Sequence, residues 1–99
     1  MKLRLALAQV NPTVGDFAGN AGLIIESTAQ ARSAGAHIVV FPEMVLTGYP
    51  VEDLALRPSF QLASKSALTA LAGEIDPHIV AIVGYLDRKS TRLNSSHRL

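Results

Sequence analysis

The sequence predicts an α/β fold with three strands and two helices, because short apolar segments alternate with longer amphipathic ones. Runs rich in leucine, valine, isoleucine and alanine occupy residues 3–9, 38–41 and 79–84. Between them, residues 21–34 and 58–75 carry apolar side chains near the spacing of a helix. This alternation is typical of a parallel sheet whose neighbouring strands are joined by helical crossovers.

The first strand is expected over residues 3–9, where an alternating pattern becomes continuously apolar. Residues 11–16 then read Asn-Pro-Thr-Val-Gly-Asp, a set of turn formers that would end it. Asn20 is a favourable N-cap, so we expect a helix over residues 21–34. Gly35 would supply the C-terminal stop of that helix.

The second strand is expected over residues 38–41 and ends at Pro42, because proline lacks the N–H needed to continue a ladder. Glu43 follows immediately, at the carboxyl edge where open α/β sheets gather ligands. Desolvation there can raise the pKa of a carboxyl group and make it a usable base near neutral pH. A solvated carboxylate at a strand end would give the same pattern, so the position alone leaves both interpretations open.

The second helix is expected to begin near Pro58, which suits a first helical turn, and to weaken at Gly73. Asp76-Pro77 forces a break because the residue before a proline avoids helical geometry. The apolar run over residues 79–84 then reads as a third, buried strand.

Composition excludes several classes of site. The 99 residues are 48% hydrophobic, enough for one small core or part of a larger one, and include no cysteine. Disulfides and thiolate metal sites are therefore excluded within the chain, and His37, His78 and His97 match no zinc spacing. Arg4 and Gln9 interrupt any signal-peptide core, so we expect a cytoplasmic protein.

The formal charge of +1 is unevenly distributed. Residues 1–86 hold five basic and seven acidic residues, a net charge of −2, and the remaining basic residues lie close together near the end. This distribution gives no support to nucleic-acid binding. The longest apolar runs are far shorter than the roughly 20 residues that span a bilayer, so we expect no membrane partner.

Several segments resemble the nitrilase (carbon-nitrogen hydrolase) superfamily. Phe41-Pro42-Glu43 followed by Leu46-Thr47-Gly48-Tyr49 is similar to its first catalytic signature. Three further segments are similar to the amidase domain of glutamine-dependent NAD synthetases. They are residues 5–16 with Gly19-Asn20, residues 48–54 and residues 57–60. The resemblance covers residues 3 to 86 and implies the N-terminal part of a four-layer α-β-β-α sandwich.

The resemblance also implies a chemistry. Members of this superfamily hydrolyse a carbon–nitrogen bond with a cysteine nucleophile, a glutamate base and a lysine that stabilises the oxyanion. Glu43 would be the base, and Tyr49 would line the glutamine pocket, although its ring could instead simply cover the strand end. Glu52 and Asp53 match the family segment but could equally cap a short helix. Lys65 does not match the family lysine and reads as a solvated charge on a helix.

The resemblance implies that the chain is an N-terminal fragment of a larger enzyme, and because it lacks a cysteine we expect this fragment to be inactive. In such an enzyme, a C-terminal synthetase domain would use ATP and magnesium to amidate deamido-NAD with the ammonia released from glutamine. The resemblance further implies a homo-oligomeric parent. Two alternatives remain open: a stand-alone amidase or nitrilase, and a non-catalytic α/β module that binds a small ligand or a partner.

The last residues do not continue the family pattern. Residues 87–97 read Asp-Arg-Lys-Ser-Thr-Arg-Leu-Asn-Ser-Ser-His, which is the conceptual translation of a common sequencing-library adaptor. They carry no hydrophobic periodicity, so a disordered basic tail is the alternative. We therefore predict a partial carbon-nitrogen hydrolase domain over residues 1–86 and a non-native tail over residues 87–99.

Overall fold

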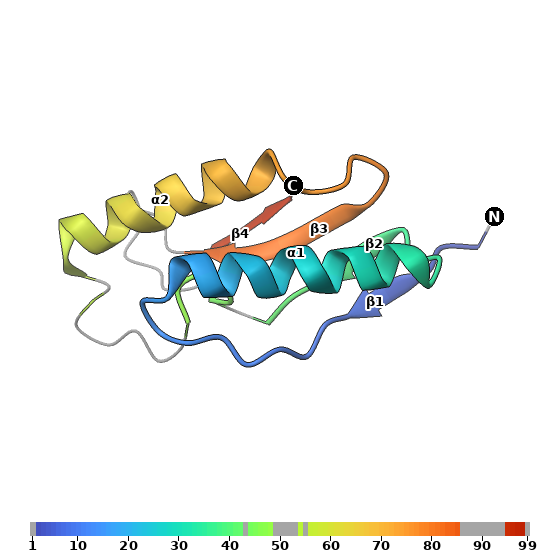
Figure 1. Ribbon diagram of the computed structural model, residues 1–99, viewed down its shortest axis with the longest axis horizontal. Coiled ribbons are helices and arrows are strands. Elements are labelled where there is room, and N and C mark those ends of the chain that lie inside the picture. Colours follow the sequence, from blue (N-terminus) through green and yellow to red (C-terminus); the bar gives the residue numbers. More distant parts are fainter. Residues whose placement is uncertain (1, 43, 49–53, 55, 86–94, 99) are drawn as a thin grey trace.

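A computed structural model describes residues 2–42, 44–48, 54, 56–85 and 95–98 (Figure 1). Strands and helices alternate through most of the chain, in the order β1 (Leu5–Leu7), α1 (Phe17–Ser33), β2 (Ile38–Val40), α2 (Pro58–Ala72), β3 (Val80–Tyr85) and β4 (Ser95–Arg98). β1 pairs with β2, and β2 with β3, both in parallel. The predicted α/β arrangement of three parallel strands and two helices is therefore confirmed.

β4 is a strand that the sequence analysis did not predict. It pairs antiparallel with β3 at the edge of the sheet, which has the order β1-β2-β3-β4. Ladder hydrogen bonds use backbone groups, so a polar segment without hydrophobic periodicity can still pair with the free edge of a buried strand. The pairing does not depend on the source of residues 87–99, and their non-native origin stays a prediction.

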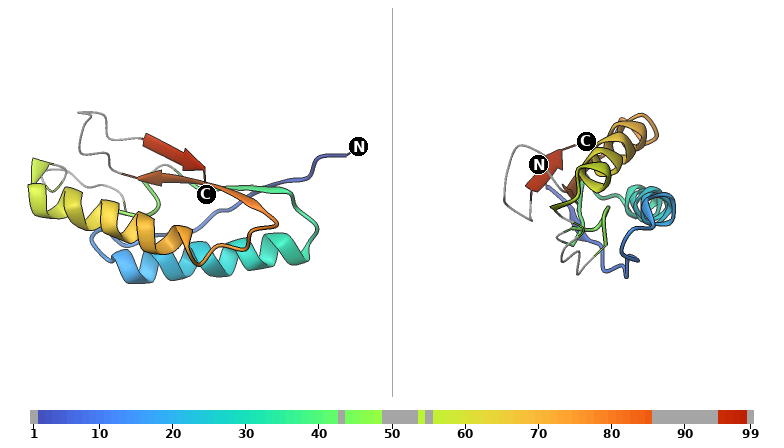
Figure 2. Two further views of the ribbon diagram at one scale, coloured as in Figure 1. Left: turned by 90° about the horizontal axis from the view of Figure 1, so that it is seen from above. Right: turned by 90° about the vertical axis from the view of Figure 1, so that its left-hand side faces the viewer.

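Both helices cover the same face of the sheet, as the end-on view in Figure 2 shows. The rings of Phe17 and Phe60, each in the first turn of its helix, pack with centroids 5.2 Å apart. The side chains on the covered face of the sheet form the core together with those of the helices and of the turn after β2; these buried residues are Ile24, Ala31, Val39, Phe41, Val45, Leu46, Leu68, Leu71, Ile79, Ala81 and Val83.

The opposite face of the sheet is apolar and is not covered by either helix. Side chains alternate along a strand, so the register that aligns Val39 with Ala81 on the core side places their neighbours on the other side. This open sheet face consists of Leu5, Leu7, Ile38, Val40, Val80 and Ile82. Leu5 is 56% exposed and Leu7 71% exposed. Such a continuous apolar surface is typical of a contact with a further layer of structure.

The start of α1 differs from the prediction. The helix begins at Phe17, one turn before the predicted start, and its N-cap is Asp16, whose Oδ1 accepts the Gly19 N–H at 3.0 Å. Asn20 is therefore inside the helix, and its backbone N–H bonds to the Asp16 carbonyl oxygen at 2.8 Å. The predicted stop at the other end is confirmed, since Gly35 follows the helix with a φ of +87°.

α2 begins at Pro58, as predicted, and ends at Ala72, before the break that was predicted at Asp76-Pro77. The helix stops directly before Gly73, because glycine is unfavourable in a helix. Its buried residues Ser64, Leu68 and Leu71 face the core. Neither α1 nor α2, nor any other helix in the described ranges, is long and apolar enough to cross a membrane.

Candidate functional site

The side chains that the sequence analysis singled out for chemistry, Glu43, Tyr49, Glu52 and Asp53, lie outside the described residues. Their predicted roles are therefore still predictions. The structure does describe the chain on both sides of position 43. The residues from 44 to 48 form a turn at the carboxyl end of β2, the edge at which a functional site was expected.

This turn is part of the core. Met44, Val45, Leu46 and Thr47 are all fully buried. Before the turn, the Phe41 N–H donates to the Ile82 carbonyl oxygen at 3.1 Å and so extends the alignment with β3 beyond the end of β2. A turn held in this way has little freedom, because moving it would disrupt both the core and the sheet edge.

The backbone of the turn has two residues in the left-handed region. Met44 has a φ of 60° and Gly48 a φ of +81°. For a residue other than glycine this conformation costs about 1–2 kcal/mol, so Met44 needs surrounding contacts to hold it. The Gly48 N–H donates to the Met44 carbonyl oxygen at 2.9 Å, and the Thr47 hydroxyl lies 3.2 Å from the same oxygen. These bonds close the turn directly after position 43.

Asn20 connects this turn to α1 and to the loop after β1. Its side chain is 1% exposed. The amide nitrogen donates to the Leu46 carbonyl oxygen at 2.9 Å and to the Thr13 carbonyl oxygen at 2.8 Å. The amide oxygen accepts the Thr13 N–H at 2.8 Å. A single buried side chain thus fixes two loops that are far apart in the sequence.

The role of Asn20 was missed because the residue was interpreted as an N-cap. Its spacing gives a signal that points elsewhere, since Asn20, Ile24, Thr28 and Ala31 recur at helical spacing and form the buried side of α1. A polar residue at the head of a buried stripe must find hydrogen-bond partners in the interior.

The described part of the site contains no ionisable side chain, since residues 41, 42 and 44–48 are Phe, Pro, Met, Val, Leu, Thr and Gly. It supplies a buried, hydrogen-bonded frame, and any proton transfer must come from other residues. Lys65 is exposed on α2, in agreement with its interpretation as a solvated charge. Among the described residues, no group of three His, Asp or Glu side chains could hold a metal ion.

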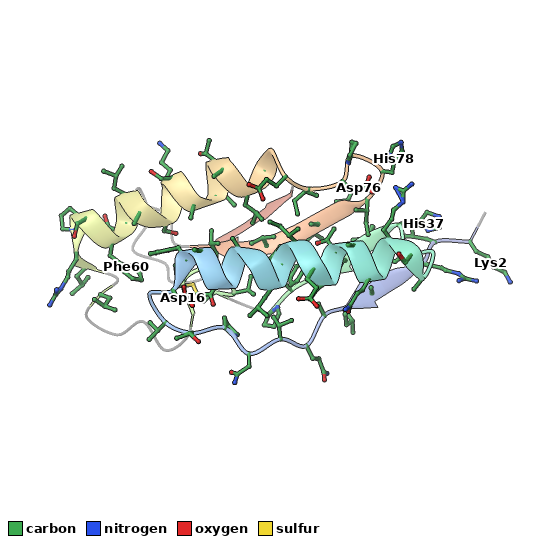
Figure 3. The ribbon with its side chains drawn as sticks, viewed as in Figure 1. Lys2, Asp16, His37, Phe60, Asp76 and His78 are labelled. Carbon is green, nitrogen blue, oxygen red and sulfur yellow. The ribbon has the colours of Figure 1, made fainter. Side chains whose placement is uncertain are left out.

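A cluster of ionisable residues lies at the other end of the molecule. Figure 3 shows His37, Asp76 and His78 at the end opposite Asp16 and Phe60. The His78 backbone N–H donates to Asp76 Oδ1 at 2.8 Å, and Arg32 Nη1 lies 3.2 Å from the same atom. These contacts, chiefly the hydrogen bond from the His78 N–H, hold the pKa of Asp76 below its ordinary value. Burial of the carboxyl group acts in the opposite direction and raises the pKa, but its effect is smaller. These contacts stabilise the folded state at that end of the molecule, but they lie far from the turn of residues 44–48.

An apolar hollow of about 260 Å³ lies between the two helices. It is lined by Phe17, Ala18, Ala21, Ile25, Ala67, Ala70, Leu71 and Glu74. None of these residues belongs to the segment from 41 to 48, so the hollow is separate from the candidate site.

The chain is similar to known proteins both in sequence and in structure. The sequence profile of the family described as carbon-nitrogen hydrolase matches residues 4–98. A glutamine-dependent NAD(+) synthetase from Thermotoga maritima is 38% identical over 96 residues, which is 96% of this chain and 17% of that protein. The structure of glutamine-dependent NAD+ synthetase from Acinetobacter baumannii superimposes with a TM-score of 0.86 and 33% identity, covering 98% of this chain and 18% of that one.

An amidase also shares part of the fold. A mutant of the amidase from Nesterenkonia sp. AN1 superimposes with a TM-score of 0.65 and 25% identity, over 82% of this chain and 32% of the amidase. That structure shows the result of Michael addition of acrylamide at the active-site cysteine of the amidase. In each of these comparisons the chain spans less than a third of the length of the protein it matches.

Proposed function

Because the chain belongs to the carbon-nitrogen hydrolase family, we propose that it is the first part of a glutamine-hydrolysing domain that supplies ammonia for the ATP-dependent amidation of deamido-NAD to NAD. The observation that carries this proposal is the likeness to glutamine-dependent NAD synthetases along 96% of the chain. The ATP and magnesium belong to a synthetase domain outside these 99 residues.

In this proposal Glu43 is the general base. It takes the proton of a cysteine thiol as the sulfur attacks the amide carbon of glutamine, and then gives that proton to the departing ammonia as the carbon–nitrogen bond breaks. Water activated by the same carboxylate hydrolyses the thioester and releases glutamate. The 99 residues contain no cysteine, so the nucleophile comes from sequence outside them, and this chain alone is inactive.

The location of the described turn supports this role for Glu43. Position 43 is directly bonded to Met44, whose backbone is fixed by the closed and buried turn. A base that serves two successive proton transfers needs a fixed position, because catalytic efficiency falls steeply when reacting groups are misplaced. Tyr49, which follows Gly48 in the sequence, is the proposed contact for the substrate glutamine.

We also propose that the open sheet face packs against a second sheet, which gives the complete domain a four-layer α-β-β-α sandwich. The face is apolar in all three parallel strands, whereas the helices occupy only the other side. Aligned packing of two sheets would cover these side chains.

The proposal is tested first by amplifying and resequencing the source locus across the codons for residues 84–99. A reading frame that continues into a segment with a lysine and then a cysteine, followed by a synthetase domain, supports the proposal. In that full-length protein, Glu43→Gln should lower glutamine hydrolysis by about 10²–10⁴-fold, because a general base contributes that much. Amidation driven by an added ammonium salt bypasses the hydrolytic step and should be unchanged. Unchanged glutamine hydrolysis in this variant would show that Glu43 is not the base.

A stand-alone amidase is the second candidate, and the likeness to the Nesterenkonia amidase over 82% of the chain favours it. The same resequencing separates the two candidates. A frame that ends soon after the amidase domain supports the stand-alone enzyme, whereas a frame that continues through a further domain supports the synthetase.

A further inference from the structure

The side chain of Asn20 uses both of its N–H donors and its acceptor oxygen in the interior. A primary amide offers one acceptor oxygen and two N–H donors. The Thr13 N–H must donate, so it faces the amide oxygen at 2.8 Å. The carbonyl oxygens of Thr13 and Leu46 must accept, so they face the amide nitrogen at 2.8 and 2.9 Å. No other side chain of this size satisfies all three groups at once, because aspartate lacks the two donors.

The two loops that Asn20 joins also contact each other directly. The Gly15 N–H donates to the Thr47 carbonyl oxygen at 2.9 Å. Gly48 lies so close to the first loop that a Cβ atom added to it would overlap the backbone of Val14 and reach within 2.5 Å of the Thr13 carbonyl carbon. The loop after β1 and the turn after β2 therefore form one unit, and Asn20 anchors that unit to α1.

The backbone of Met44 depends on this unit. Its positive φ of 60° is unfavourable for a residue with a side chain, and it persists only where the surroundings over-determine it. Within the turn, the hydrogen bond from the Gly48 N–H fixes the carbonyl group of Met44. The side chain of Asn20 fixes the carbonyl group of Leu46, two residues further along the chain. Loss of the Asn20 contact would leave the strained backbone of Met44 with fewer contacts that hold it.

We propose that Asn20 is a positioning residue for catalysis, because it fixes the turn of residues 44–48, which directly follows Glu43 in the chain. This inference rests on the proposed function, because it takes Glu43 as the base. It assigns to α1 a part in the chemistry that does not require contact with the substrate.

Two substitutions and one control test this inference. Asn20→Asp keeps the shape and the acceptor but removes both donors, and Asn20→Ser is a smaller, uncharged alternative in case the aspartate variant does not fold. The matched control is Thr28→Val. Thr28 lies on the same buried side of α1, and its hydroxyl has no hydrogen-bond partner among the described residues, so its removal leaves no broken contact.

The first measurement is amide hydrogen exchange in the 99-residue chain. The amides of Gly15 and Gly48 should exchange at least about tenfold faster in the Asn20 variants than in the control, since their bonds join or close the two loops. Equal exchange in the Asn20 variants and the control would overturn the inference, whatever the function of the protein.

The second measurement is glutamine hydrolysis by the full-length enzyme that carries these residues. The Asn20 variants should lose up to about 100-fold in kcat, as expected for a misplacement near 1 Å. The Asn20 variants should also shift the acidic limb of the pH–rate profile of glutamine hydrolysis. Their ammonium-driven amidation should be unchanged, and so should both activities of the Thr28→Val enzyme. A residue that only stabilised the fold would lower the two activities together and leave the pH profile in place, and that result would overturn the inference.

If Glu43→Gln abolishes hydrolysis but the Asn20 variants do not reduce it, the inference fails alone. If Glu43→Gln leaves hydrolysis intact, the proposed function fails and the inference with it.

Discussion

Gly48 provides the sharpest test of the packing at the candidate site, because Gly15 is a matched control for it. Both glycines have nearly the same φ, +81° and +80°. A Cβ atom added to Gly15 would have no heavy atom within 4 Å, whereas one added to Gly48 would overlap the backbone of Val14 and Thr13. The two alanine substitutions therefore impose the same conformational strain but differ in steric contact.

The expected magnitudes follow from this difference. Gly15→Ala should lower the free energy of unfolding by about 1–2 kcal/mol, the cost of a left-handed conformation for a residue with a Cβ. Gly48→Ala carries the same cost and a further 1–3 kcal/mol or so for overpacking, since the obstructing atoms are backbone and cannot rotate away. The total of about 2–5 kcal/mol is a large part of the stability of a small domain.

Urea denaturation followed by circular dichroism measures both variants against the unmodified chain. With a slope near 1 kcal/mol per molar urea, typical of a small protein, the midpoint of Gly48→Ala should lie at least about 1 M below that of Gly15→Ala. Equal midpoints would refute the close approach of the two loops, and with it the argument that the turn of residues 44–48 is fixed by the loop after β1.

Two further predictions concern other parts of the molecule. Asp76→Asn should remove an acid-dependent part of the stability: the pKa of Asp76 is lowered in the folded state, so its contribution is present above the ordinary value of 3.8 and is lost as the pH falls through the lowered value. The difference in urea midpoint between the unmodified chain and this variant should therefore shrink between pH values of about 6 and about 2, and a constant difference would contradict the assignment. Replacement of Leu5 and Leu7 together by lysine should reduce concentration-dependent association of the isolated chain in analytical ultracentrifugation, because both side chains lie on the open sheet face. Association that persists unchanged would mean that another surface mediates it.

The order and type of the first five elements could be predicted from the sequence because they depend on local patterns. Pro58 marks the start of α2 through its own backbone preference, and this limit agrees with the structure. The end was predicted at Asp76-Pro77, but the helix already stops before Gly73, because glycine weakens a helix. The start of α1 was wrong by one turn because Asp16 and Asn20 are both good N-caps, and local preference does not choose between them. Burial decides the choice, since Asn20 has its partners in the core.

The sequence by itself determined the alternation of strands and helices and the end of β2 before Pro42. These features follow from interactions between residues a few positions apart. The position of Glu43 at the carboxyl edge of the sheet stays a prediction, because that residue lies outside the described ones. Only the tertiary structure decided that Asn20 is an anchor rather than a cap, and that β4 pairs with the edge of β3. The hydrogen bond from Asn20 to Leu46 joins residues 26 positions apart. A contact of that kind has no local signature, because it exists only once α1 has packed against the sheet and brought the two loops together.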